Sequence, residues 1–519
     1  MIRARCVALA AGLLCACSPT EQPVPSAPTD GPGSSARAEP ALNIVLILAD
    51  DLGYGDVGVY DPDSKIPTPR IDQLAREGVR LLDAHSPTSI CSPSRYGVLT
   101  GREPWRETHV QHSLRPTSPP VLKEGLPTLP ELLARAGYTT ALVGKWHLGR
   151  RYALLPTRHS HELRNIDWSQ PLVDGPLQHG FDHFFGLARP GWTFMEDGLV
   201  LAPPSEEFDL GDVPEEIFGR HAHQGQRAPG FRFEQVLPRY TEWTVEFIER
   251  VASREGPFFL EFAPAVPHTP IAPSPAFRGT TSVGAYGDIV HQLDDSVGQI
   301  LDALERAGVA DDTLVVFTSD NGPETHAYDR LRHSGHASMG PLRGAKHSMF
   351  EGGHRVPFIA RWPGHIPADS TSNETISLVD LMATFASAAR IVLPADAAVD
   401  SHDVMPALLG EPGDAPIREV TFHSRSRRVS IRRGAWVLLE SGGGGRPEPP
   451  WFLDQRNIVD RQRRGVALFD LENDLAQTKN LAAQHPDRVE SLRALRTRLT
   501  ASERTAPRGP EVAPAARAR

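Results

Sequence analysis

The stretch Asn43-Ile44-Val45-Leu46-Ile47-Leu48-Ala49-Asp50-Asp51 indicates the fold class of this chain. Its apolar residues follow one another without a polar interruption and end at two adjacent carboxylates. An unbroken apolar run is typical of a strand that is covered on both faces, as the strands of parallel sheets are. We therefore predict a buried strand over residues 43–48 with polar side chains at its carboxyl end.

The same design recurs in three further segments. They span residues 138–143, 258–262 and 313–319, and polar residues follow each of them. In open α/β sheets the ligand site lies beyond the carboxyl ends of the strands. We therefore expect one rim of the sheet to gather the polar side chains of Asp50, Asp51, Lys145, His147, His268, Asp320 and Asn321.

Helical patterns separate these strands. Apolar residues recur at helical spacing over residues 288–307, and a similar pattern covers residues 378–389. A third helix is expected over residues 128–137, where Thr128 and Glu131 have the spacing of a capping box. Alternating strands and helices predict an α/β fold, with a large, mixed, mostly parallel sheet flanked by helices.

Short alternating segments follow residue 416. Residues 420–422, 429–431 and 435–439 have the pattern of antiparallel strands, a Gly-rich loop spans residues 441–445, and residues 489–499 have the pattern of a helix. The sequence therefore predicts a smaller C-terminal domain made of an antiparallel sheet plus a helix.

The composition indicates an ordinary globular protein. The chain has 519 residues, of which 40% are hydrophobic and 23% charged, and its formal net charge is −10. That charge argues against a nucleic-acid binder, so any recognition of anions must be local. One basic cluster is either a guide for a polyanionic glycan or a solvated strand face. It comprises Arg425, Arg427, Arg428, Arg432 and Arg433.

The amino terminus has the pattern of an export signal over residues 1–17, in which a basic start precedes a short apolar segment. The run Leu14-Cys15-Ala16-Cys17 resembles a bacterial lipobox. It predicts an exported protein of the periplasm or cell surface that contacts the membrane only through a lipid on Cys17. Cys15 is less usual at its position than a small residue, which leaves cleavage without lipidation open. Residues 18–40 predict a disordered tether.

Cys91 is the only cysteine in the body of the chain, because Cys6, Cys15 and Cys17 crowd the amino terminus. A lone cysteine is most often a small buried hydrophobic residue. Here Pro93 lacks a backbone donor and Arg95 carries a permanent charge, which are unusual neighbours for a core cysteine. Cys91 is therefore either inert or chemically special.

The adjacent carboxylates Asp50 and Asp51 repel each other, by about 4 kcal/mol at a separation of roughly 4 Å. An isolated pair of this kind most often includes a helix cap. Asp320 and Asn321 follow another strand of the same predicted sheet, and this second oxygen-rich pair favours a metal. Oxygen ligands select Ca²⁺ or Mg²⁺ over zinc.

The run Cys91-Ser92-Pro93-Ser94-Arg95, followed by Thr100-Gly101-Arg102, resembles the signature of the arylsulfatase-type sulfatases. Other motifs occur in that family's order from Asn43 to Asp474, including Gly144-Lys145-Trp146-His147-Leu148-Gly149, Pro267-His268-Thr269-Pro270 and Arg343-Gly344-Ala345-Lys346. The resemblance implies an alkaline phosphatase-like fold and formylglycine-dependent hydrolysis of sulfate monoesters, of a carbohydrate or an aryl alcohol.

In that family a separate formylglycine-generating enzyme oxidises the signature cysteine, and the hydrated aldehyde is the nucleophile. The resemblance implies this change at Cys91, whose new oxygen would complete a Ca²⁺ site, with Mg²⁺ as the alternative. The implied metal ligands are Asp50, Asp51, modified Cys91, Asp320 and Asn321. The implied catalytic residues are Cys91, Arg95, Lys145, His147, His268 and Lys346.

The resemblance also implies roles for these side chains. Arg95 would favour the ionised form of the attacking hydroxyl, and Lys145 would contact the sulfate. His147 would deprotonate the second hydroxyl of the diol, which then expels sulfate and restores the aldehyde. His268 and Lys346 would hold the sulfate and assist departure of the alcohol.

The implied domain arrangement is a catalytic sulfatase domain over residues 41–415, a small α+β domain over 416–504 and a disordered tail over 505–519. The expected substrate is a sulfated small molecule or glycan. Two other functions stay open at this point: a phosphate mono- or diester hydrolase of the same superfamily, and a non-catalytic binding protein with unconverted Cys91. Residues 181–192 depart from familiar sulfatases. Residues 186–191 stand where some of them have a polar residue near the sulfate, so no sulfate contact is assigned there.

Overall fold

The computed structural model describes residues 42–160, 162–208, 225–411, 413–425, 428–440, 447–459 and 465–507. The predicted export signal, tether and Gly-rich loop lie outside these residues. The predicted tail lies outside them from residue 508 onward, whereas Thr505 and Ala506 donate backbone hydrogen bonds to the carbonyl of Val399 at 3.0 and 3.1 Å. The described body packs as one unit.

A ten-stranded sheet forms the centre of the body, in the order β12-β2-β11-β10-β1-β9-β3-β4-β5-β6. The strands from β10 to β4 run parallel, whereas β11, β5 and β6 pair antiparallel with their neighbours. The fold class expected from the sequence is therefore confirmed. The bounds are β1 Asn43–Ala49, β2 Val79–His85, β3 Thr139–Gly144, β4 His183–Ala188, β5 Thr193–Glu196, β6 Leu199–Val200, β9 Phe258–Ala263, β10 Thr313–Ser319, β11 Phe358–Arg361 and β12 Ser370–Ser377.

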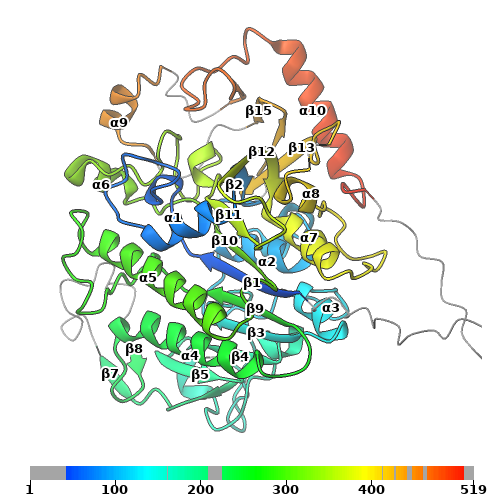
Figure 1. The fold of residues 1–519 in the computed structure, drawn as a ribbon. Helices are drawn as coiled ribbons and strands as arrows, with labels where there is room; N and C mark the ends of the chain where they lie inside the picture. Colours follow the sequence, from blue (N-terminus) through cyan, green and yellow to red (C-terminus); the bar gives the residue numbers. More distant parts are fainter. Residues whose placement is uncertain are drawn as a thin grey trace, which may run out of the picture. The chain divides into compact units, whose positions relative to one another are not determined.

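Helices cover both faces of this sheet (Figure 1). Ile44, Leu46 and Leu48 of β1 pack with α2, α3 and α7, whereas Val45 and Ile47 pack with α1, α4 and α5. Side chains alternate along a strand, so two covered faces require the unbroken apolar run seen in the sequence. The bounds are α1 Pro69–Arg76, α2 Cys91–Thr100, α3 Leu129–Arg135, α4 Val236–Val251, α5 Ala285–Arg306, α6 Ala327–Ser334, α7 Leu381–Ala388 and α8 Met405–Leu408.

The parallel registry aligns the carboxyl ends of four neighbouring strands. Ile47 of β1 pairs with Phe317 of β10 and with Phe262 of β9, which in turn pairs with Val143 of β3. The residues that follow these strands therefore meet along one rim, as the sequence predicted. The capping box that begins α3 is also present, with the Thr128 hydroxyl accepting from the Glu131 N–H.

A four-stranded antiparallel sheet, in the order β13-β14-β15-β16, lies toward the carboxyl end of the chain. Its core joins Ile431 and Leu468 to Val489 and Leu492 of α10. Its bounds are β13 Val420–Arg425, β14 Arg428–Arg433, β15 Trp436–Leu439, β16 Ala467–Asp470 and α10 Pro486–Thr500, with α9 Pro450–Gln455 nearby in sequence. A separate pair comprises β7 Glu206–Phe208 and β8 Gly225–Arg227.

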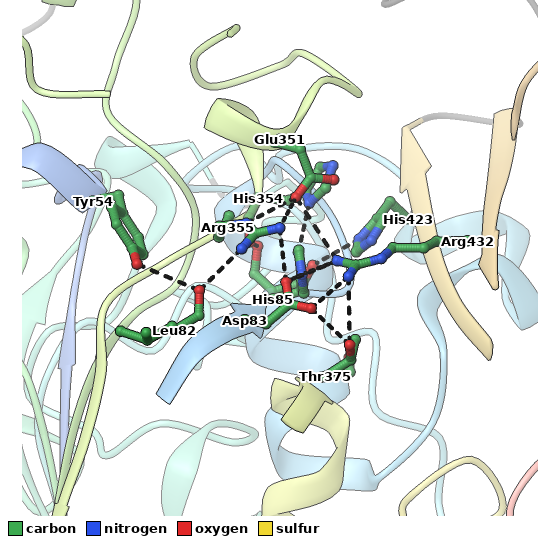
Figure 2. A network of polar contacts seen from close by, with 12 residues as sticks. Tyr54, Leu82, Asp83, His85, Glu351, His354, Arg355, Thr375, His423 and Arg432 are labelled. Atoms are coloured by element: carbon green, nitrogen blue, oxygen red, sulfur yellow. Dashed lines mark hydrogen bonds and ion pairs between the residues drawn. The ribbon is translucent and has the colours of Figure 1, made fainter. Parts of the chain in front are cut away.

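A buried polar network joins the two sheets (Figure 2). Asp83 of β2 contacts Arg355 Nη2 at 2.8 Å and Arg432 Nη1 of β14 at 2.8 Å. Arg432 is only 7% exposed, so a solvated strand face does not describe this arginine. His85, His354 and His423 stack or tilt against one another within the same network.

None of the described helices is both long enough and apolar enough to cross a membrane.

Candidate active site

Cys91 begins helix α2 directly beyond the rim of the sheet. It is 1% exposed, and it is the free cysteine of the described residues. Lys346 Nζ lies 3.1 Å from its Sγ. The helix N-terminus provides a positive partial charge at this position, which favours an anion formed there.

Three carboxylates surround Cys91 at the ends of neighbouring strands. Ligand atoms of Asp50, Asp51, Asp320 and Cys91 all lie within 4.8 Å of one another. Asp51 has a positive φ of 68°, an uncommon backbone conformation that clusters at functional sites. Asp51 and Asp320 are 269 residues apart in sequence and meet because β1 and β10 are adjacent.

These residues fit a hard divalent cation. Asp50 Oδ1 and Asn321 Oδ1 are both buried and accept no hydrogen bond, although buried polar atoms ordinarily have partners. A cation bound by carboxylate and amide oxygens would satisfy both atoms. The soft thiol of Cys91 is the exception in this set, and an oxygen in its place would make the ligands uniform.

Three cationic side chains balance the three carboxylates. Lys145 Nζ contacts Asp50, Lys346 Nζ lies 2.6 Å from Asp51 Oδ1, and Arg95 Nε donates to Asp320 Oδ2 at 2.9 Å. Burial opposes ionisation of Asp50, but Lys145 and the neighbouring cations hold its pKa well below the usual value. Burial likewise opposes the charge on Lys346, and Asp51 nevertheless raises the pKa of this lysine.

The unmodified Cys91 is a poor nucleophile in this setting. Burial raises the pKa of its thiol to about 12, with Asp50 and Asp320 adding to the effect and Lys145 and Lys346 opposing it. Nucleophilic cysteines need a thiolate, which this environment disfavours at neutral pH.

His147 presents a free base to the site. Its Nε2 lies 2.9 Å from the carbonyl oxygen of Leu114, which can only accept, so Nε2 carries the proton. Nδ1 is buried without a hydrogen-bond partner and is left as a proton acceptor. Burial and the charge of Lys145 hold the pKa of His147 well below its usual value, which keeps the imidazole neutral.

His268 has the opposite arrangement of ring nitrogens. Its Nδ1 donates to the carbonyl of Thr269 at 2.7 Å, and its Nε2 lies 3.9 Å from Asp51 Oδ2. The side chain is 33% exposed, more than the other predicted site residues with a stated exposure. Burial lowers the pKa of His268, and Asp50 opposes this effect.

A cavity of about 360 Å³ opens beside this cluster. Lys145, His147 and His268 line it, together with aromatic residues such as Trp192 and Tyr240. Cys91, Arg95 and Lys346 do not line the cavity, but Arg95 Nη1 donates to the carbonyl of Lys145, which does, at 2.8 Å.

The structure thus brings together all the catalytic and metal-ligand candidates that the sequence analysis named. The metal-ligand candidates Asp50, Asp51, Cys91, Asp320 and Asn321 form one cluster with Arg95, Lys145 and Lys346, and His147 and His268 border the same cavity. Sequence reasoning missed Arg150, Arg189, Trp192 and Tyr240, which belong to the cavity wall. Arg189 and Trp192 lie within the departing stretch 181–192, but that departure alone does not indicate where their side chains lie.

Comparisons with known proteins agree with this geometry. The sulfatase family profile, described as Sulfatase, matches residues 42–391. The chain is 32% identical over 494 residues to an N-acetylgalactosamine-6-O-sulfatase of Bacteroides thetaiotaomicron, covering 87% of this chain and 92% of the relative. It is 37% identical over 406 residues to the N-acetylgalactosamine-6-sulfatase of Homo sapiens, covering 75% of this chain and 69% of the relative.

A solved structure is also similar. It comes from work on the metabolism of multiple glycosaminoglycans by Bacteroides thetaiotaomicron, and it matches with a TM-score of 0.74 at 29% identity, covering 89% of this chain and 100% of that chain. The fold, the site and these relatives define a sulfuric ester hydrolase. The chain belongs to the sulfatase family.

Proposed function

We propose that this sulfatase removes sulfate from sulfated carbohydrates, with Cys91 converted to formylglycine by a formylglycine-generating enzyme and a bound Ca²⁺ or Mg²⁺. The observation that carries the proposal is the cluster of Cys91 with three carboxylates and three cations at the rim of the sheet. Relatives that act on N-acetylgalactosamine 6-sulfate, by their names, support a sugar as the alcohol.

The cation and the formylglycine have defined places in this proposal. Asp50, Asp51, Asp320 and Asn321 would hold the cation together with the oxygen at position 91. Formylglycine supplies a hydroxyl nucleophile when hydrated, and the cation supplies positive charge that stabilises the anionic sulfate. The two unpartnered oxygens on Asp50 and Asn321 are the atoms that such a cation would satisfy.

The chain's own residues supply the remaining chemistry. Lys145 reaches from the carboxylate cluster to the cavity, where it can bind a sulfate oxygen. His147 can accept a proton on Nδ1, because its Nε2 carries the proton that is donated to the Leu114 carbonyl and Nδ1 has no hydrogen-bond partner. Lys346 carries its proton at neutral pH, so we assign to it, with His268, the stabilisation and protonation of the leaving oxygen.

The same proposal extends to location and domain organisation. We propose that the protein is exported to the periplasm or cell surface and anchored through a lipid on Cys17, on the evidence of the lipobox-like run alone. We also propose residues 41–415 as the catalytic domain and 416–504 as a supporting domain. The buried Asp83–Arg432 contact, which crosses this boundary, would hold the two together.

The test is release of inorganic sulfate from N-acetylgalactosamine 6-sulfate by protein whose position 91 has been examined by peptide mass spectrometry. We expect turnover by converted protein and none by the Cys91→Ala variant, which cannot form the aldehyde. An unmodified thiol in protein from the native host would contradict the formylglycine mechanism. Hydrolysis of an aryl phosphate as fast as the matching aryl sulfate would contradict the preference for sulfate esters.

A further inference from the structure

The wall of the active-site cavity contains cationic side chains and no carboxylate among the residues that the structure describes. Lys145 is neutralised from outside the cavity by Asp50. Arg150 and Arg189 are different, because no ion pair of either guanidinium occurs within the described parts of the chain. Half-buried arginines without a counter-ion are unusual, since a buried charge is ordinarily paired.

Arg189 is held by stacking. Its guanidinium carbon lies 3.6 Å from the centroid of the Trp192 ring. Its backbone is fixed by Tyr152, whose hydroxyl donates to the Arg189 carbonyl at 2.6 Å and accepts from the Arg189 N–H at 3.1 Å. Nε of Arg189 is buried and has no hydrogen-bond partner. The stacking and the backbone contacts therefore fix the position of Arg189, whose guanidinium has no ion-pair partner among the described residues.

Arg150 lies close enough to Arg189 for their charges to interact. Burial, reinforced by the charge of Arg150, lowers the pKa of Arg189 to about 10, so Arg189 remains charged at neutral pH. Arg150 Nη1 donates to the Leu187 carbonyl at 2.8 Å, which orients it without neutralising it. Two neighbouring positive charges repel each other, and an anion bound between them would remove this cost.

The sulfate to be cleaved does not account for these two arginines. The carboxylate cluster already gathers Arg95, Lys145 and Lys346 around position 91. Arg150 and Arg189 line the cavity together with the aromatic residues Trp192 and Tyr240, which suit the apolar face of a sugar ring. A ligand that fills the cavity would therefore contact these two arginines as well as Lys145.

We propose that Arg150 and Arg189 form a subsite for a second anionic group of the substrate, a carboxylate or a second sulfate ester on the same glycan. The planar guanidinium fork matches the paired oxygens of both groups. The inference rests on the proposed function and narrows its substrate class to carbohydrates that carry at least one anion besides the sulfate that is cleaved.

The test compares three substrates that share one scissile sulfate. They are N-acetylgalactosamine 6-sulfate, N-acetylgalactosamine 4,6-disulfate, and a disaccharide in which a uronic acid is joined to N-acetylgalactosamine 6-sulfate. We expect wild-type protein to prefer one of the two substrates with a second anion. The disulfate arm identifies a second sulfate ester as the ligand, and the uronic acid arm identifies a carboxylate.

Two variants test the residues, Arg189→Ala and Arg150→Ala. Because a hydrogen bond to a charged group contributes about 1.5–3 kcal/mol, each should lower kcat/KM for the preferred substrate roughly 10- to 100-fold, mainly through KM. The loss with the monosulfate should stay below about threefold. Arg189→Lys should give an intermediate loss, because it keeps the charge but not the fork. Arg254→Ala, an exposed arginine beyond the far end of α4, is the matched control.

The outcomes separate the two proposals. If Arg189→Ala and Arg150→Ala lose the same factor with all three substrates, the arginines act on the scissile sulfate or on the fold, and the second-anion subsite is wrong. The same conclusion follows if wild type prefers the monosulfate. If converted wild-type protein releases no sulfate from any of the three, the proposed function fails first and the subsite with it.

Discussion

The free energy of unfolding of this protein should fall steeply in acid, because the negative charge of Glu351 stabilises the buried polar network that joins the two sheets. It is fully buried, and its Oε2 contacts Arg355 Nη2 at 2.7 Å and Nε at 2.8 Å. Arg432 of the small sheet lies 3.9 Å away, as Figure 2 illustrates. The perturbation we choose is Glu351→Gln, which removes the charge and keeps the shape.

The magnitude follows from the shift in pKa. Burial alone would raise the pKa of Glu351, but Arg355, His85, His354 and Arg432 lower it from 4.5 to about 2. A carboxylate with a depressed folded-state pKa contributes stability that is fully present above its unfolded pKa. That stability is lost as the pH falls through the folded pKa. The shift corresponds to about 3 kcal/mol in total, of which about 2 kcal/mol would be lost by pH 3.

The assay is the free energy of unfolding in urea, followed by tryptophan fluorescence at pH values from 6 to 3. Asp83 and the active-site carboxylates titrate in both proteins, so the difference between wild type and variant isolates Glu351. We expect Glu351→Gln to be less stable than wild type at pH 6, because Arg355 loses a buried charged partner. The difference in unfolding free energy between the two proteins should narrow by about 2 kcal/mol by pH 3. Glu249 is half exposed, so the unfolding free energy of Glu249→Gln should change with pH in the same way as that of wild type. A constant gap between Glu351→Gln and wild type would refute the reasoning.

Three further predictions concern the site and the core. Chelation should abolish sulfate release and added Ca²⁺ or Mg²⁺ should restore it, with Asp320→Asn needing at least tenfold more cation; full activity in chelator would contradict the metal site. His147→Ala should lower kcat by about 10²- to 10⁴-fold with little change in KM, as expected for loss of a general base, and an unchanged kcat would exclude that role. Phe317→Ala in β10 should cost about 3–5 kcal/mol of unfolding free energy, against less than about 0.5 kcal/mol for the exposed Val459→Ala. Equal urea midpoints for these two variants would contradict the burial of Phe317 in the core that covers one face of the sheet.

The rim of the sheet could be predicted because it depends on strand ends. Buried parallel strands can be recognised in a sequence as unbroken apolar runs. The residues that follow two such strands must lie close together wherever the strands are neighbours in the sheet. Asp50 and Asp320 are 270 residues apart, yet the pairing of β1 with β10 places them in one cluster. The chemistry around Cys91 came from family resemblance, since spacing alone does not distinguish an inert cysteine from a modified one.

The cavity wall and the buried polar network that joins the two sheets could not be predicted in the same way. Arg189 and Trp192 lie in a connection where no periodic pattern fixes the side-chain direction, and their stacking is a tertiary contact. Arg432 belongs to a run of arginines that suggests a solvated strand, but its partner Asp83 lies 349 residues earlier in the chain. Contacts of this range depend on how two sheets dock, which local propensity does not encode.

The burial of Cys91 constrains when it can be modified. All ten residues of α2 are buried, and Arg95, which follows Cys91 by one helical turn, donates a hydrogen bond to Asp320 of the same cluster. A modifying enzyme would need the thiol and its neighbours in an accessible segment, and the folded protein exposes only 1% of Cys91. The conversion proposed for Cys91 would therefore have to precede the packing of α2 against the sheet. A chain that is exported before it folds would offer this interval, which connects the export signal proposed for residues 1–17 with the chemistry proposed at residue 91.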